Sequence, residues 1–259
     1  MITNKIKKLF GMKKDETTNE EVFEQQIQAR KESEAAADNI DAVSEPDQYA
    51  DDPNLEVQMD QDNEKSLEEL EENTFIETSA EAVGYENRES QWNIYRVMGQ
   101  YINPESTITD FGCARGDFKS FFLSEYEIDL DYTGIDMNKQ LIDAGLKINP
   151  DFNLIHTDWK DYNETSDWCI NIGSHDVRYD ANTVMDDKTY LMNTINHMYN
   201  CCNDGLAIML ASDILQQDEG IITWNAGEIL NEVLTKFRTA SIDHSYSDAI
   251  FTLIIYKND

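Results

Sequence analysis

Basic side chains are scarce in this sequence: 20 Lys and Arg stand against 52 Asp and Glu, which leaves a formal net charge of −32. A protein binds the phosphate backbone of duplex nucleic acid chiefly by displacing its counterions with Lys and Arg. No basic patch is visible in the more hydrophobic, C-terminal part of the chain. We therefore expect no duplex nucleic acid as partner, whereas small molecules and basic proteins remain compatible with the charge.

Cysteines and long apolar runs are also few. The four cysteines, Cys113, Cys169, Cys201 and Cys202, show no pair at the spacing of a zinc site, and we expect them to be reduced, structural thiols. No stretch approaches the roughly 18 apolar residues of a membrane span, and the N-terminus lacks the apolar segment of a secretory signal. The expectation is a cytoplasmic protein without a transmembrane segment and without a metal site.

Large apolar residues are sparse in residues 1–80, which carry 22 acidic and 8 basic side chains. Such a segment cannot bury a core and is expected to be disordered or partly helical, with short helices over Asn19–Ala37 and Ser66–Glu72. Its first fourteen residues hold five lysines and no acid. They form either a frayed terminus or a small basic amphipathic docking segment. This acidic extension is a candidate binding segment for a protein partner.

Residues 81–259 carry the remaining 30 acidic and 12 basic side chains and all four tryptophans, so this part can fold. Short β-branched and aromatic runs alternate there with longer amphipathic stretches, which is typical of βα units and a mainly parallel sheet. Strands are expected at Thr107–Phe111, Tyr132–Asp136, Asn153–His156, Trp168–Ile172, Leu206–Ala211, Thr239–Ile242 and Ile250–Tyr256. Helices are expected at Glu86–Tyr101, Asp117–Glu125, Lys139–Leu146, Thr189–Cys202 and Ala226–Lys236.

The last two strands are joined by only seven residues, too few for a helical crossover. They should therefore pair as an antiparallel hairpin at the end of a mostly parallel, Rossmann-like α/β sheet.

The strongest local signal is Ile108–Phe118, a strand that runs into a turn of small residues and then into an amphipathic helix. Gly112 and Gly116 let the backbone pass close to a ligand, and the helix N-terminus beyond them offers free N–H groups and a positive dipole end.

This turn resembles the glycine-rich motif of class I S-adenosylmethionine-dependent methyltransferases, Asp-x-Gly-x-Gly-x-Gly. Asp110, Gly112 and Gly116 match, and Ala114 replaces the middle glycine. The added methyl group is tolerated at negative φ and would crowd the cofactor at positive φ. A nicotinamide cofactor is disfavoured because the spacing is not Gly-x-Gly-x-x-Gly, although a site for another nucleotide stays open.

Two further acids follow strands. Asp136 at the tip of the second strand can accept hydrogen bonds from both ribose hydroxyls, and it can also cap the following helix. After the third strand, the resemblance places Asp158 against the adenine amino group and Trp159 against the ring. The residues expected to bind S-adenosylmethionine are Asp110, Gly112, Cys113, Ala114, Gly116, Asp136, Met137, Asp158, Trp159 and Gln91.

The fourth strand ends in Ser174, His175 and Asp176, where the transferable methyl group would point. Methyl transfer from a sulfonium needs alignment, desolvation and in some cases a base. The candidate catalytic residues are His175, His244 and Tyr246. The stretches Gly173–Lys188 and Asp213–Asn225 are expected to form the pocket of an unidentified acceptor.

The chain is also similar to small methyltransferases of unassigned substrate, many of them carried by bacteriophages. The stretches that carry this similarity include Arg88–Trp92, the glycine-rich turn and the closing Phe251–Lys257. Two hypotheses follow. The first is methyl transfer from S-adenosylmethionine to a small-molecule or protein acceptor, and the second is an inactive descendant that serves as a structural or docking unit, for example on a phage particle.

Overall fold

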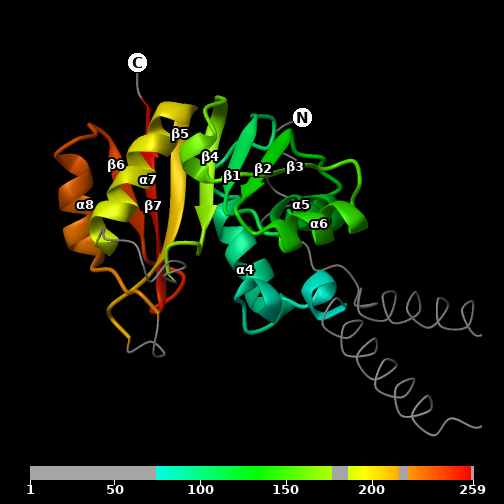
Figure 1. Ribbon diagram of the computed structural model, residues 1–259. Helices are drawn as coiled ribbons and strands as arrows, with labels where there is room; N and C mark the ends of the chain where they lie inside the picture. Colours follow the sequence, from blue (N-terminus) through cyan, green and yellow to red (C-terminus); the bar gives the residue numbers. More distant parts are fainter. Residues whose placement is uncertain (1–73, 177–185, 216–220, 258–259) are drawn as a thin grey trace, which may run out of the picture. The chain divides into compact units, whose positions relative to one another are not determined.

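The part of the chain that the computed structural model describes, residues 74–176, 186–215 and 221–257, forms a seven-stranded sheet with helices on both faces (Figure 1). The strand order is β3-β2-β1-β4-β5-β7-β6. The strands are β1 (Ile108–Phe111), β2 (Tyr132–Asp136), β3 (Asn153–His156), β4 (Ser166–Ile172), β5 (Cys202–Ala211), β6 (Ala240–Asp243) and β7 (Ile250–Tyr256). The helices are α4 (Arg88–Met98), α5 (Asp117–Tyr126), α6 (Lys139–Ile148), α7 (Asp187–Cys201) and α8 (Ala226–Leu234), with 3-10 turns η1 (Glu81–Val83) and η2 (Trp159–Asp161).

Strands β1 to β5 run parallel, and β7 lies antiparallel between β5 and β6. The register places Asp110 of β1 level with Gly134 of β2 on one side and with Ile170 of β4 on the other. Because the strand order reverses between β1 and β4, the loops that follow these strands diverge and leave a crevice at their carboxyl ends. Open α/β sheets bind ligands at such a crevice.

Alternate side chains of the sheet enter two hydrophobic cores. Ile108 packs into the core beneath α4, α5 and α6, whereas Phe111 packs into the core beneath α7 and α8. Parallel strands covered on both faces are apolar throughout, and all four residues of β1 are buried. The polar members of β1, Thr109 and Asp110, are therefore exceptions that need a structural or functional reason.

Side-chain caps fix where most helices begin. The side-chain oxygens of Asn87, Asn138, Asp186 and Asn225 each accept a backbone N–H in the first turn of α4, α6, α7 and α8. Helix α5 differs, because it begins after Gly116 in a left-handed conformation and has no side-chain cap. Its first backbone N–H groups lie at the end of the glycine-rich turn, where they can donate hydrogen bonds to a ligand.

The expected fold class is confirmed, including the closing antiparallel hairpin. The largest difference in bounds is at β5, which begins at Cys202 rather than at Leu206, because α7 runs directly into the strand. Between β3 and β4 the chain makes only the short turn η2. The four cysteines are free and buried.

Some expectations concern residues outside the described part of the chain. These are the basic segment at residues 1–14, the helices at Asn19–Ala37 and Ser66–Glu72, and the middle of each expected acceptor loop. No helix among the described residues is long and apolar enough to cross a membrane.

Candidate functional site

The carboxylate of Asp110 lies inside the crevice at the end of β1 and is only 3% exposed. The Tyr132 hydroxyl donates a hydrogen bond to its Oδ2 at 2.7 Å, whereas its Oδ1 is buried without a partner among the described residues. Burial raises the pKa of Asp110 to about 7, and the nearby charges of Asp136 and Asp117 raise it further while the Tyr132 bond opposes the shift. The site therefore holds a carboxyl group that is poised to ionise near neutral pH and has one oxygen to spare.

The glycine-rich turn is anchored to the neighbouring strand. The N–H groups of Gly112 and Cys113 both donate to the carbonyl of Ile135, at 2.8 and 3.0 Å. Gly112 has φ +83°, and a Cβ added there would lie 2.8 Å from the Cβ of Ser174. Only glycine therefore allows this turn to pass so close to the loop that follows β4.

Ala114 occupies the left-handed region with φ +51°. This conformation costs an alanine about 1–2 kcal/mol relative to the right-handed region, so the surrounding structure must hold it. The Ala114 N–H donates to Oδ2 of Asp136 at 2.8 Å, which ties the turn to the end of β2. This φ is positive, and a positive φ is the case in which the methyl group of Ala114 was expected to crowd a cofactor.

Asp136 binds two backbone N–H groups at the end of β2. Besides Ala114, the N–H of Asn138 donates to Oδ1 at 2.8 Å. Burial raises the pKa of Asp136, and these N–H groups oppose the rise. Each carboxylate oxygen has a second lone pair, so the group can accept further hydrogen bonds. Met137 follows it and is 56% exposed.

Asp158 and Trp159 lie together after β3. Asp158 caps η2 by accepting the Lys160 N–H at 3.1 Å. The indole N–H of Trp159 donates to the Tyr190 hydroxyl of α7 at 2.8 Å, and the Trp159 ring packs on the core beneath α7. The Trp159 ring is therefore held in a fixed position at the end of β3.

Asn171 near the end of β4 is a site candidate that the sequence reasoning missed. It is 2% exposed, and its amide nitrogen donates to the Phe111 carbonyl at 2.5 Å and to the Ser174 hydroxyl. Its Oδ1 is buried without a partner in the described structure. An amide side chain within an otherwise apolar strand was the signal that could have identified it.

His175 packs against α7. Its ring lies 5.5 Å from that of Tyr190 on α7, the residue that also holds Trp159. The side chain is 5% exposed and its Nε2 has no partner in the described residues. Burial lowers the pKa of His175 to about 4, so the ring is neutral at physiological pH.

His244 and Tyr246 lie in the hairpin between β6 and β7. The Nε2 of His244 is 2.9 Å from the Ser212 hydroxyl, and its ring stacks on Phe251. The Tyr246 hydroxyl is 2.7 Å from the Thr252 hydroxyl, and burial raises the pKa of Tyr246 to about 12. These two candidates contact β5 and β7, whereas His175 contacts α7.

Gln91 is buried on α4 and belongs to a polar network rather than lying open to the crevice. Its amide donates to the Tyr95 hydroxyl at 3.0 Å and to the Asp117 carboxylate at 3.3 Å. Arg115 donates to the same carboxylate at 2.8 Å and to the Ile76 carbonyl at 2.7 Å. Gln91 and Arg115 therefore both position Asp117 in the first turn of α5.

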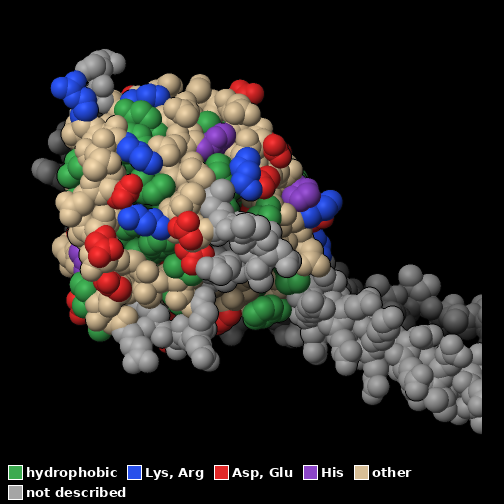
Figure 2. Space-filling model, turned by 60° about the vertical axis from the view of Figure 1, so that its left-hand side comes forward, with side chains coloured by type: hydrophobic (Ala, Val, Ile, Leu, Met, Phe, Trp, Pro, Cys, Tyr) green, Lys and Arg blue, Asp and Glu red, His purple; other side chains and the backbone are tan. Residues whose placement is uncertain are grey.

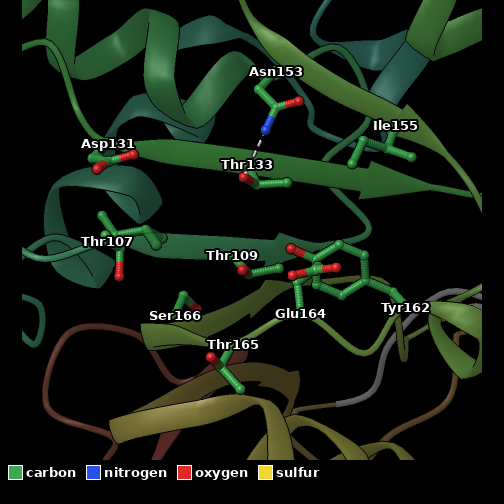
Figure 3. Close-up of a pocket in the computed structure, with 11 residues that line it drawn as sticks. Thr107, Thr109, Asp131, Thr133, Asn153, Ile155, Tyr162, Glu164, Thr165 and Ser166 are labelled. Atoms are coloured by element: carbon green, nitrogen blue, oxygen red, sulfur yellow. Dashed lines mark hydrogen bonds between the residues drawn. The ribbon is translucent and has the colours of Figure 1, made fainter.

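A separate pocket of about 340 Å³ lies over β1, β2 and β3 and beside the segment that leads into β4 (Figure 3). Threonines 107, 109 and 133 line it from β1, β2 and the segment before β1, and the Asn153 amide donates to the Thr133 hydroxyl at 2.8 Å. Only the short turn η2 connects β3 to β4, so no long helix among the described residues covers this part of the sheet. Its side chains here carry hydroxyl groups, which can contact water. The pocket contains none of the predicted site residues.

Lys and Arg side chains on the face shown in Figure 2 are interspersed with Asp and Glu and do not gather in a patch. This face lacks the continuous positive surface that duplex nucleic acid requires.

No family model matches the sequence, and no curated protein matches it. Among solved structures, a SAM-dependent methyltransferase from Archaeoglobus fulgidus aligns with a TM-score of 0.50 and 16% identity, over 66% of this chain and 95% of that chain. The chain has a class I methyltransferase fold. The Pnkp1/Rnl/Hen1 RNA repair complex contains a chain that aligns with a TM-score of 0.50 and 15% identity, over 67% of this chain and 42% of that chain. Both alignments support the fold only. The roles of the site residues depend on their own geometry.

Proposed function

We propose that this protein transfers a methyl group from S-adenosylmethionine to a small-molecule or protein acceptor. The observation that carries the proposal is the position of three acids on three adjacent parallel strands: Asp110 lies within β1, Asp136 ends β2, and Asp158 comes two residues after β3. Asp136 and Asp158 also accept backbone N–H groups, whereas Asp110 is buried with one oxygen unpaired among the described residues, which costs free energy in a sheet that serves only as a scaffold.

The methionine half of the cofactor fits the polar groups at the ends of β1 and β4. Asp110 Oδ1 and Asn171 Oδ1 are both hydrogen-bond acceptors, and both are buried without partners in the described structure. Asp110, the charged one of the two, suits an ammonium group, which has three donors and a positive charge. The uncapped N-terminus of α5 suits the accompanying carboxylate.

The nucleoside half fits the residues after β2 and β3. Asp136 would accept hydrogen bonds from the ribose hydroxyls, and Asp158 would accept a hydrogen bond from the adenine amino group. Trp159 and the exposed Met137 would supply apolar surface to the ring. Gly112, Cys113, Ala114 and Gly116 would lie beneath the cofactor as backbone.

The bound cofactor supplies a methyl group on a positively charged sulfur. What the chain itself contributes is alignment of the acceptor, exclusion of water and removal of a proton where the acceptor carries one. His244 and Tyr246 in the hairpin would line the acceptor side. His175, being neutral and held against Tyr190, would support the cofactor side.

The test is calorimetric titration of S-adenosylmethionine and of S-adenosylhomocysteine into the full chain. We expect saturable binding in the micromolar range, on the order of −8 kcal/mol. Asp136→Ala should weaken it by about tenfold or more, because the variant loses charge-assisted hydrogen bonds. Asp131→Ala is the matched control, since Asp131 is exposed and precedes the same strand at its other end. It should bind like the unchanged protein.

A folded protein that binds neither compound would refute the proposal. It would favour the alternative of an inactive structural or docking protein, for which the left-handed Ala114 is the supporting observation. Loss of binding in Asp131→Ala but not in Asp136→Ala would move the site to the pocket of Figure 3.

A further inference from the structure

The acceptor side of the crevice contains a buried carboxylate that no sequence motif predicted as a catalytic group. Asp176 follows β4 and is 9% exposed. The Ala211 N–H at the end of β5 donates to its Oδ1 at 2.8 Å. Its Oδ2 lies 3.8 Å from the place that a Cβ on Gly173 would occupy. One oxygen is thus fixed by the sheet, and the other faces the glycine loop after β4.

Two elements besides its own loop interact with this carboxylate at the carboxyl edge of the sheet, the edge to which the β4 arrow points in Figure 1. Tyr85, ahead of α4, and Tyr246, in the β6–β7 hairpin, both interact electrostatically with Asp176. Among residues 74–176, 186–215 and 221–257, no Lys or Arg forms an ion pair with it. Within these parts of the chain, the negative charge therefore has two tyrosines in its electrostatic surroundings and no positively charged ion-pair partner.

The loop after β5 brings apolar surface to the same place. The Ile222 N–H donates to the Asp176 carbonyl at 2.8 Å, which fixes this loop beside the carboxylate. Three neighbouring side chains of the loop are unusually exposed for their type: Ile214 at 63%, Leu215 at 47% and Ile221 at 36%. Exposed apolar side chains at the rim of a polar crevice are typical of a surface that binds the apolar body of a ligand.

We infer that the acceptor is a primary amine with an apolar body, and that Asp176 binds its ammonium group and takes up its proton. The inference rests on the proposed function. An ammonium supplies the charge that the carboxylate lacks, whereas a carboxylic acid as acceptor would be repelled by Asp176 and by Asp110. A neutral alcohol would leave the buried carboxylate without a counter-charge among the residues that the structure describes.

One N–H bond of the ammonium breaks, its electron pair stays on nitrogen, and the proton moves to Oδ2 of Asp176. The nitrogen lone pair then forms a bond to the methyl carbon, while the carbon–sulfur bond breaks and its electron pair remains on sulfur. The products are a methylated, positively charged amine and the neutral thioether of S-adenosylhomocysteine.

Burial raises the pKa of Asp176 to about 7, and the Ala211 N–H opposes the shift. A carboxyl group with this pKa can accept a proton at neutral pH and release it again after turnover. The other titratable groups that face this region are Tyr85, Tyr246 and Asp110, and both tyrosines have pKa values raised by burial, so they remain protonated. Asp110 has a similarly raised pKa but accepts the Tyr132 hydroxyl on β2, so on the side of β5 and the hairpin Asp176 is the group that can exchange a proton near pH 7.

The experiment measures binding, so it does not depend on turnover. The full chain is saturated with S-adenosylhomocysteine, and 2-phenylethylamine, 2-phenylethanol and phenylacetate are titrated into it by calorimetry. These probes share an apolar body and differ in the polar group. We expect the amine to bind at least about tenfold more tightly than the alcohol, and phenylacetate to bind least.

Asp176→Asn is the diagnostic variant, because its amide oxygen can still accept the Ala211 N–H and keep the fold. It should weaken amine binding by about tenfold to a hundredfold and leave the affinity for S-adenosylhomocysteine within about twofold. The matched control is Asp204→Asn, an exposed residue at the opposite end of β5 from Ala211. Its amine affinity should stay unchanged.

Equal binding of amine and alcohol, no amine binding to the saturated protein, or an equal loss in both variants would each overturn the inference. These outcomes leave the proposed methyltransferase intact as long as S-adenosylhomocysteine binds. Failure of S-adenosylhomocysteine itself to bind would overturn the proposed function as well.

Discussion

Replacing Ala114 by glycine should stabilise the protein, although alanine-to-glycine changes usually destabilise. Ala114 has φ +51°, in the left-handed region that glycine adopts without penalty. Relief of this conformation is worth about 1–2 kcal/mol. Glycine gives back about 0.5–1 kcal/mol through the greater freedom of the unfolded chain. The Ala114 N–H that donates to Asp136 is retained, so no hydrogen bond is lost.

The net gain is therefore about 0.5–1 kcal/mol, which corresponds to a rise in Tm of about 1–4 °C for a folded unit of this size. Thermal and urea unfolding of the full chain, followed by tryptophan fluorescence, measure it directly, since all four tryptophans lie after residue 80.

Ala144→Gly is the matched control. Ala144 lies within α6 and is 6% exposed, so the same substitution there should cost about 1 kcal/mol in helix propensity and about 0.8 kcal/mol in lost burial. Equal destabilisation by the two variants would refute the reasoning, because Ala114 would then have an ordinary right-handed backbone.

Three further predictions concern the same crevice. Because the raised pKa of Asp110 lies at about 7, its charge is lost as pH falls below 7, so affinity for S-adenosylhomocysteine should fall with it; Asp110→Asn should bind weakly and without this pH dependence, measured by calorimetry between pH 5.5 and 8. Gly112→Ala should lose about 2–4 kcal/mol of unfolding free energy in urea, from its φ of +83° and the contact with Ser174; a loss within 0.5 kcal/mol, on the order of an ordinary surface change, would contradict this. Trp159→Phe should cost about 1 kcal/mol of stability through the lost bond to Tyr190 while keeping cofactor affinity within a few fold; a complete loss of binding would show that the indole N–H itself is required.

The fold could be predicted because its signals are local. Strands were visible as short β-branched runs, and the caps Asn87, Asn138 and Asn225 stand directly before the helices that they begin. The antiparallel hairpin followed from the length of one loop. The start of β5 at Cys202 could not be predicted from the sequence, because α7 passes into the strand with no turn residue between them.

The candidate site was predicted in part. Asp110 and Asp136 follow strands, and the structure brings them to one crevice because parallel strands end at the same edge. The amide of Asn171 in an apolar strand marked it as unusual, but the sequence does not reveal whether its oxygen has a partner. That depends on Phe111 and Ser174, which satisfy the nitrogen and leave the oxygen unpaired.

The orientation of the side chains after β4 also could not be predicted from the sequence. His175 and Asp176 are adjacent in the chain, yet the first contacts Tyr190 of α7 and the second is held by Ala211 of β5. Gly173 itself has a left-handed backbone conformation, with φ +82°, at the point where the loop leaves β4. Such a choice depends on tertiary packing and not on residue type alone.

The most direct test of the proposed cofactor site is backbone hydrogen–deuterium exchange of the full chain with and without S-adenosylhomocysteine. The account predicts protection of the glycine-rich turn at residues 112–116, of residues 136–138 after β2 and of the turn at residues 158–160. Protection confined to residues 107–109, 131–133 and 164–166 would place the ligand in the pocket of Figure 3 and would contradict the account.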